Sequence, residues 1–118
     1  MLNRRSLGTL APNPGRTQRL GGWVSFNHAP TLWGSYNVSS VTDDGTGLYT
    51  VTWARALTAT TYAVVGSVRS NADDGGKQVG IQPGTVPSLT SVQLVTGTNN
   101  SAAAADVHEI CLAALEPL

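Results

Sequence analysis

The chain has 118 residues, of which 41% are apolar and 12% are charged, and its seven Lys and Arg balance its seven Asp and Glu. This length suits one domain with a modest core. Such sparse, balanced charge argues against nucleic acid as a partner and against an acidic, solvating chain. No run approaches the roughly 20 apolar residues of a membrane helix, so we expect no membrane insertion. The single cysteine excludes an internal disulfide.

The first 21 residues differ in composition from the rest. They contain prolines and glycines that interrupt helices and strands, and no acid appears before Asp43. Four of the seven cationic residues lie here, namely Arg4, Arg5, Arg16 and Arg19. We therefore predict an extended N-terminal arm over residues 1–21 and a β-domain over residues 22–118. The arm is either a solvated terminus or an attachment arm that orders on a partner through these arginines. Its apolar content is too low for a signal peptide.

Alternating polar and apolar residues predict strands after the arm. The clearest pair is a hairpin, in which a strand containing Tyr36 and Val38 leads through the turn residues 43–47 into a strand whose Tyr49, Val51 and Trp53 share one core-facing side. Strands are expected near residues 22–27, 33–42, 48–55, 61–70, 77–82, 89–96 and 106–115. Seven short strands separated by turns indicate an all-β fold, a single antiparallel β-sandwich of jelly-roll-like type.

The last segment fits two structures. Ser101 is a possible helix N-cap, and apolar residues follow it at helical spacing. However, Ile110, Leu112 and Ala114 also alternate as they would in a strand. We predict a strand here, and a helix over residues 101–116 is the alternative.

The chain offers little for catalysis or metal binding. His28 and His108 have no neighbours at metal-ligand spacing. Two Asp-Asp-Gly sequences lack the full alternating-oxygen pattern of a calcium loop. Nucleophile and phosphate-binding motifs are missing, and few groups titrate. We expect no enzyme activity, no metal and no cofactor, and we expect Cys111 to be a small buried hydrophobe.

Recognition is the remaining role for the aromatic and loop residues. Trp33 stands beside Gly34 and near a polar loop, where its indole either stacks on a sugar ring or fills a subunit contact. The loops after residues 70 and 97 are rich in amides and carboxylates. The candidate receptor contacts are Trp33, Asn71, Asp73, Asp74, Asn99 and Asn100.

Three segments carry a resemblance: WVSFN at 23–27, SYNVSSVTDDGTGLYTV at 35–51 and YAVVG at 62–66. Together they resemble a small β-domain of tailed-bacteriophage structural proteins, often found at the outer end of tail fibres. The resemblance covers about residues 22–70. It implies a trimeric fibre or spike component of the virion, assembled in the cytoplasm of the bacterial host.

Two functions follow as expectations. In the first, a homotrimeric fibre domain attaches to other virion proteins of the tail or capsid through its arm and contacts a host surface glycan or protein. In the second, the protein is a capsid decoration protein with no receptor role. A polysaccharide depolymerase is a distant third, because it usually needs a longer chain and paired carboxylates in a groove.

Overall fold

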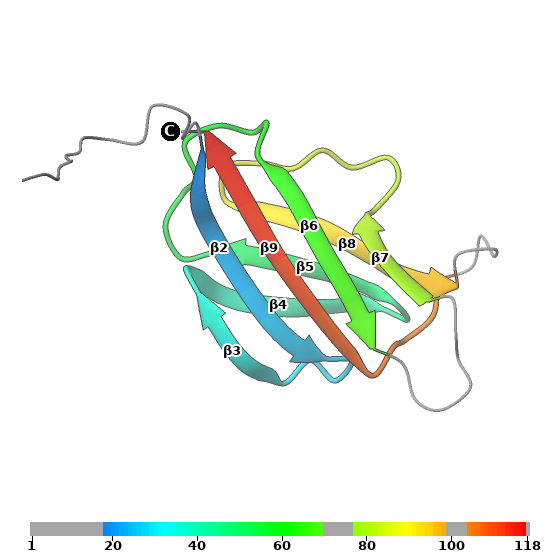
Figure 1. Cartoon of the computed structure of the whole chain (residues 1–118). Helices are drawn as coiled ribbons and strands as arrows, with labels where there is room; N and C mark the ends of the chain where they lie inside the picture. Colours follow the sequence, from blue (N-terminus) through cyan, green and yellow to red (C-terminus); the bar gives the residue numbers. More distant parts are fainter. Residues whose placement is uncertain (1–17, 70–76, 99–103, 118) are drawn as a thin grey trace, which may run out of the picture.

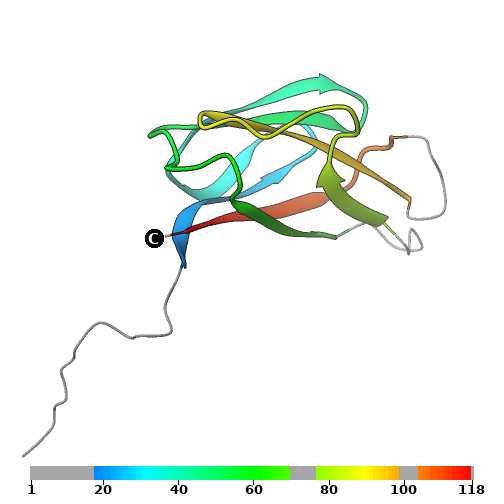
Figure 2. The same ribbon diagram turned by 90° about the horizontal axis from the view of Figure 1, so that it is seen from above.

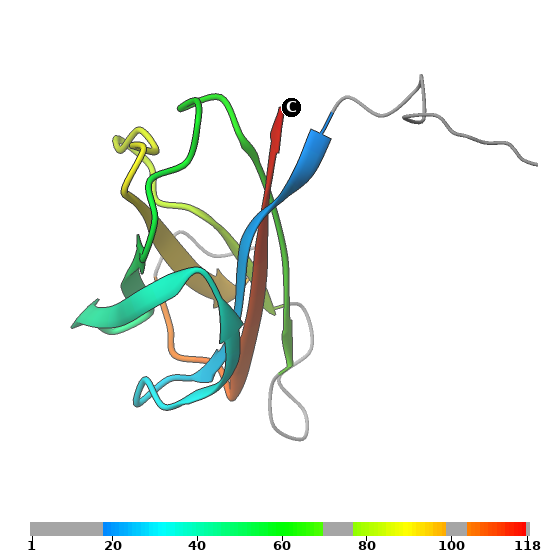
Figure 3. The same cartoon turned by 90° about the vertical axis from the view of Figure 1, so that its left-hand side faces the viewer.

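The computed structural model describes residues 18–69, 77–98 and 104–117, which form two four-stranded antiparallel sheets packed face to face. The first sheet, in spatial order, contains β3 (Leu32–Tyr36), β2 (Gln18–Asn27), β9 (Glu109–Pro117) and β6 (Ala63–Arg69). The second contains β4 (Val38–Gly45), β5 (Leu48–Trp53), β8 (Ser91–Thr98) and β7 (Lys77–Ile81). Figure 1 shows the first sheet in front of the second, and Figures 2 and 3 show the two layers from other sides. The predicted all-β antiparallel sandwich is confirmed.

The core forms where the inward residues of both sheets meet. From the first sheet come Val24, Phe26 and Ile110, all fully buried. From β5 come the three predicted core residues Tyr49, Val51 and Trp53, none more than 4% exposed. The rings of Phe26 and Tyr49 meet edge to face at 5.3 Å. Burying each such side chain stabilises the fold by roughly 1.5–3 kcal/mol. The burial of Tyr49, Val51 and Trp53 confirms the predicted core face of β5.

The β4–β5 hairpin is also confirmed, with its turn where the sequence predicts it. The amide of Gly45 donates to the Asp43 carboxylate at 3.0 Å. Gly47 adopts a φ of 68°, which glycine tolerates without strain. The turn is therefore built from the residues whose spacing predicted it.

The single strand expected over residues 33–42 is wrong. The structure divides it at Asn37, whose φ of 57° turns the chain from β3 in the first sheet to β4 in the second. Positive φ is uncommon outside glycine, and asparagine is one of the residues that adopt it most readily. Alternation continues on both sides of Asn37, so the pattern alone did not reveal the corner.

The strand predicted from residue 22 begins four residues earlier, at Gln18. Arg19, which the sequence placed in the arm, therefore lies in β2 opposite Glu116 of β9. Its guanidinium donates to the Glu116 carboxylate at 3.3 Å, and that side chain is only 1% exposed. Arg4, Arg5 and Arg16 lie outside the described residues. Arg19 is therefore part of the first sheet, where its guanidinium forms an ion pair with the buried Glu116.

The strand predicted at the C-terminus is confirmed as β9, although it begins at Glu109 rather than at residue 106. It pairs with β2 on one side and β6 on the other. Ile110, Leu112 and Ala114 face the core and are buried, as their alternation requires. This strand is therefore central to the first sheet, and its other side chains form the middle of the outer face.

Candidate functional site

The outer face of the first sheet carries rows of apolar side chains, because residues paired across antiparallel strands project to the same side. One row contains Leu20, Leu115 and Ala63, from β2, β9 and β6. The next contains Tyr36, Trp23, Ala113 and Val65. We call these seven residues the apolar face. Four of them are large and between 38% and 50% exposed, namely Leu20, Trp23, Tyr36 and Val65.

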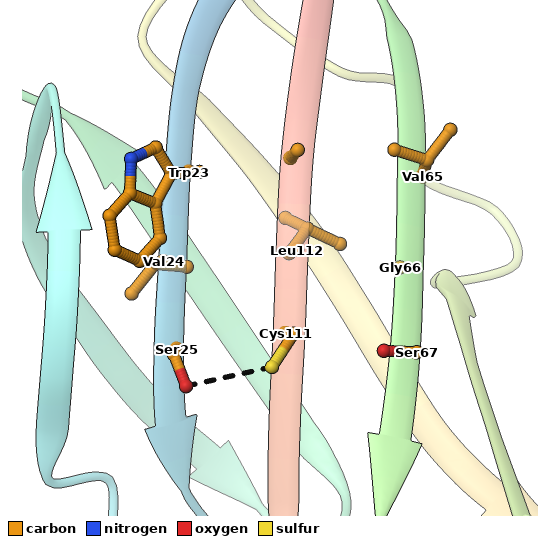
Figure 4. A pocket seen from close by; sticks show the side chains of 9 residues that line it. Trp23, Val24, Ser25, Val65, Gly66, Ser67, Cys111 and Leu112 are labelled. Carbon is orange, nitrogen blue, oxygen red and sulfur yellow. Dashed lines mark hydrogen bonds between the residues drawn. The ribbon is translucent and has the colours of Figure 1, made fainter.

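A hollow of about 450 Å³ lies on this face beside the apolar rows. Trp23 of β2 and Val65 of β6 stand on either side of it, with Cys111 of β9 between these two strands (Figure 4). Ala113 of β9 pairs with both Trp23 and Val65 and also lines the hollow. Trp23 forms a ridge on β2 and Val65 forms a second ridge on β6, and the smaller Cys111 and Ala113 of β9 leave a groove between these ridges. The volume is within the range of ligand sites, which is roughly 300–1,000 Å³.

The Trp23 ring packs over Gly34 of β3, which has no side chain. A Cβ atom added to Gly34 would lie 2.9 Å from the Cη2 atom of the Trp23 ring, so the indole covers the backbone of Gly34. A glycine inside a strand often marks such a close approach. Gly34 thus leaves the space that the ring of Trp23, on the neighbouring strand, occupies.

Polar groups gather at the other end of the same face. The Ser25 hydroxyl donates to the Glu109 carboxylate at 3.5 Å, and the Cys111 thiol donates to the Ser25 oxygen at 3.5 Å. Arg69 donates to Glu109 at 2.6 Å. This charge-assisted bond holds the pKa of Glu109 below its ordinary value. The face therefore changes from apolar to polar along the strands.

Cys111 departs from its prediction. It belongs to the outward-facing set of β9, with Ser25 and Ser67 as its paired neighbours, and its side chain is half-buried rather than in the core. The alternation of Ile110 and Leu112 explains this, because both neighbours of Cys111 face inward.

Trp33 is the one candidate receptor contact that the structure describes. Ser25 pairs with Gly34 and Phe26 pairs with Leu32, so Trp33 is the extra residue of a β-bulge, which is a common way to redirect a side chain. It is 50% exposed, and its ring centroid lies 6.2 Å from that of His108. The remaining candidates, Asn71, Asp73, Asp74, Asn99 and Asn100, lie outside the described residues.

The described residues that flank those loops nevertheless locate one end of the sandwich. Arg69 pairs with Glu109, which also pairs with Asn27, and Lys77 pairs with Thr98 (Figure 1). We call this the loop end of the sandwich. Trp33 and His108 lie there, next to Leu32 and Glu109. At the opposite end Gln18 pairs with Pro117.

A buried acid links the strands at that opposite end. The Thr58 amide and hydroxyl each donate to Glu116 at 2.8 Å, and Arg19 donates from the other side. Burial alone raises the pKa of this carboxyl, but the donors outweigh burial and the pKa is lowered. Glu116 is therefore ionised in the fold at neutral pH, where it bonds to both Thr58 and Arg19.

The described part of the chain holds no group of three or more His, Cys, Asp and Glu placed to bind a metal ion. It also contains no helix long and apolar enough to cross a membrane.

Sequence reasoning missed this face. The core is the default expectation for Trp23, although Val24 and Phe26 leave its side of the strand ambiguous. That expectation is wrong, because Trp23 lies on the outer face and is 38% exposed. The sequence predicts no role for Val65.

The sequence does contain a signal for this face. In residues 63–65 and 112–115 every position is apolar, so both sides of each strand carry apolar side chains. A strand that is apolar on both sides is expected to be covered on both sides.

Comparisons with protein-family models, curated proteins and solved structures give no match.

Proposed function

We propose that this protein is a structural component of a bacteriophage virion, a fibre or spike domain of the tail or the head that attaches at one end and contacts the host surface at the other. It acts as a homotrimer and binds without catalysis, metal or cofactor. The protein assembles in the bacterial cytoplasm, and its fold needs no disulfide, since the chain has a single cysteine, which is free.

The proposal is carried by the direction of β2, which joins the arm at one end of the sandwich and reaches the loop end at the other. The chain enters the sheet at Gln18, and the arm precedes this residue. Asn27 lies at the loop end, nine residues further along the strand, which corresponds to roughly 30 Å. Attachment through Arg4, Arg5 and Arg16 therefore leaves the loop end free to project, which is the polarity that a fibre tip requires.

The chemistry at the loop end suits a hydroxyl-rich ligand. Trp33 presents a half-exposed indole, on which the apolar face of a sugar ring can stack. The loops after Arg69 and Thr98 contain three asparagines and two aspartates among the candidate contacts, whose amides and carboxylates bind hydroxyl groups. We therefore favour a host surface glycan as the receptor, and a surface protein is the second choice.

Adsorption measurements test this function. Virions carrying Asp73→Ala, Asp74→Ala, Asn99→Ala and Asn100→Ala together should lose host adsorption while particle assembly and the melting temperature of the domain stay nearly unchanged. Single surface substitutions usually alter stability by no more than ~0.5 kcal/mol. Gln93→Ala, which removes an exposed amide from the second sheet, is the matched control and should adsorb normally.

The capsid decoration function gives a different result in the same assay. Variant particles would adsorb normally if the loops have no receptor role. Loss of particle integrity by the fourfold variant would point more strongly to decoration, because loops that are buried against neighbouring capsid proteins contribute to the assembly itself.

A further inference from the structure

We infer that the apolar face of the first sheet is the contact surface between copies of this chain. This inference rests on the proposed homotrimer and names the surface through which the copies meet. Its residues lie on β2, β3, β6 and β9 and are separate from the loop end that we assign to the receptor.

Exposure is the first argument. Four large side chains of this face are each at least 38% exposed, and they lie in two adjacent rows with Ala63, Ala113 and Leu115 between them. Soluble monomers rarely expose contiguous apolar patches larger than a few hundred Å². Trp and Tyr are also the residues that most often dominate binding energy at protein interfaces. The face therefore has the composition of an interface centre.

Shape is the second argument. The β2 ridge ends in Trp23, the β6 ridge carries Val65, and the small residues of β9 form the groove between them (Figure 4). If β9 faces a three-fold axis, the β2 ridge of one copy lies against the β6 ridge of the next. Each copy then supplies both halves of one repeated contact, and the ring closes after three copies.

The area that copies of this chain can bury between them is large enough for assembly only if three copies meet. Four strands spaced about 4.8 Å apart are about 19 Å wide, and a strand of nine residues is about 30 Å long, so the whole outer side of the first sheet, with the apolar face on it, offers roughly 600 Å² per copy. In a three-fold ring each copy shares this area between two neighbours, so one contact buries roughly 600 Å² and the closed ring buries roughly 1,700 Å² in total. A single contact of this size is weak, whereas the closed ring reaches the area of a standard interface, so we expect three copies to assemble together.

Charge favours the same partner. The two apolar rows contain no charged side chain, and the Arg69–Glu109 pair lies at their polar margin. Residues 1–17 carry three Arg and no acid, whereas residues 18–118 carry four cationic and seven acidic side chains, giving formal charges of +3 and −3. The formal charge of the whole chain is therefore zero, so net charge does not drive full-length copies apart.

Cys111 provides a probe of this surface, because it is the only cysteine in the chain and lies on the groove. The experiment follows thiol labelling of the full chain by a chromogenic disulfide reagent across the micromolar range, with sedimentation at the same concentrations. Labelling should become slower as the trimer forms, by about tenfold when nine-tenths of the chain is assembled, since only the free chain reacts.

Val65→Arg is the disrupting variant and Val86→Arg is its matched control. Val86 is also an exposed valine, at 84%, but lies in the connection between β7 and β8, away from the first sheet. Val65→Arg should be monomeric with fast, concentration-independent labelling, whereas Val86→Arg should behave as the parent chain. Trp23→Ser provides a second disrupting variant, and circular dichroism shows whether each variant is folded.

The outcomes separate this inference from the proposed function. A trimer that resists Val65→Arg and labels rapidly overturns the contact surface but leaves the trimer in place. A dimer that protects Cys111 and is lost in Val65→Arg supports the surface and contradicts the three-fold assembly. A monomer overturns both. Slow labelling of a chain that sediments as a monomer shows that the chain covers its own face, which also overturns the inference.

Discussion

The side chain of Asn37 and the backbone of Arg55 hold each other at the corner between the two sheets. The Arg55 amide donates to the Asn37 side-chain oxygen at 2.7 Å, and the Asn37 amide nitrogen donates to the Arg55 carbonyl at 3.1 Å. The same nitrogen also donates to the Gly21 carbonyl at 2.8 Å. One side chain therefore fixes β2, the β3–β4 corner and the end of β5 relative to one another.

Asn37→Ala should destabilise the domain by about 2–4 kcal/mol, because it combines lost hydrogen bonds with a strained positive φ. Asn37→Gly keeps the backbone relaxed, so it should cost about 1 kcal/mol less than the alanine variant. Urea denaturation of both variants measures the two contributions separately. Equal losses in the two variants would show that the backbone angle contributes nothing.

This corner also marks the limit of what sequence predicted. Period-2 alternation located most of the strands and the core side of β5, because buried and partly buried residues alternate along that strand. It did not find the exchange between sheets at Asn37, since alternation continues through the corner. The one signal for a corner was the asparagine itself. Asparagine also occurs in other turns and loops, so its presence within a strand pattern does not identify a corner.

The candidate site was predicted less well, for a related reason. Trp33 was recognised because it stands near a loop, and it is half-exposed. Trp23 was expected in the core by default, because Val24 and Phe26 made both sides of its strand look apolar, and its 38% exposure shows that this was wrong. Only the pairing of Trp23 with Ala113 and Tyr36 shows that it belongs to a continuous outer surface.

Gly47→Ala should be far more damaging than Gly84→Ala. Both glycines have positive φ, 68° and 82°, so both variants bear a strain of about 1 kcal/mol. A Cβ on Gly47 would lie 2.6 Å from the Ala105 amide nitrogen, whereas none of the described atoms lies within 4 Å of one on Gly84. We expect Gly47→Ala to cost at least about 3 kcal/mol in thermal unfolding. Similar melting temperatures would mean that the residue 104–106 connection moves away without cost.

Acid should destabilise the domain through Glu116. Its pKa is lower in the fold than its ordinary value of 4.5, so its stabilising contribution is complete above that value. The contribution declines as pH falls below 4.5 and through the folded pKa. Melting temperature measured between pH 7 and pH 3 should therefore be level at first and then fall. A melting temperature that rises on acidification would contradict the ion pair and the Thr58 bonds.

Glu116→Gln tests whether this carboxylate is responsible. The variant keeps an oxygen that accepts from Thr58 but loses the ionic bond with Arg19, so it should cost about 1–3 kcal/mol at neutral pH and flatten the acid limb. Arg19→Gln should cost less, because the Arg19 side chain is 48% exposed and its pairing is screened by water. A Glu116→Gln variant with an unchanged acid limb would assign the pH dependence to another carboxylate.

Trp33→Ser should weaken host adsorption without unfolding the domain. The side chain is half-exposed and its described ring contact is with His108, so we expect a stability loss below about 1 kcal/mol. If the indole stacks on a sugar, losing it should reduce the affinity of the purified domain for host cells about tenfold, equivalent to about 1.4 kcal/mol. Trp33→Phe keeps a flat apolar ring and should retain part of the binding. Sedimentation decides between this role and a subunit contact, because a Trp33→Ser protein that dissociates into monomers would place Trp33 between copies instead of at the receptor.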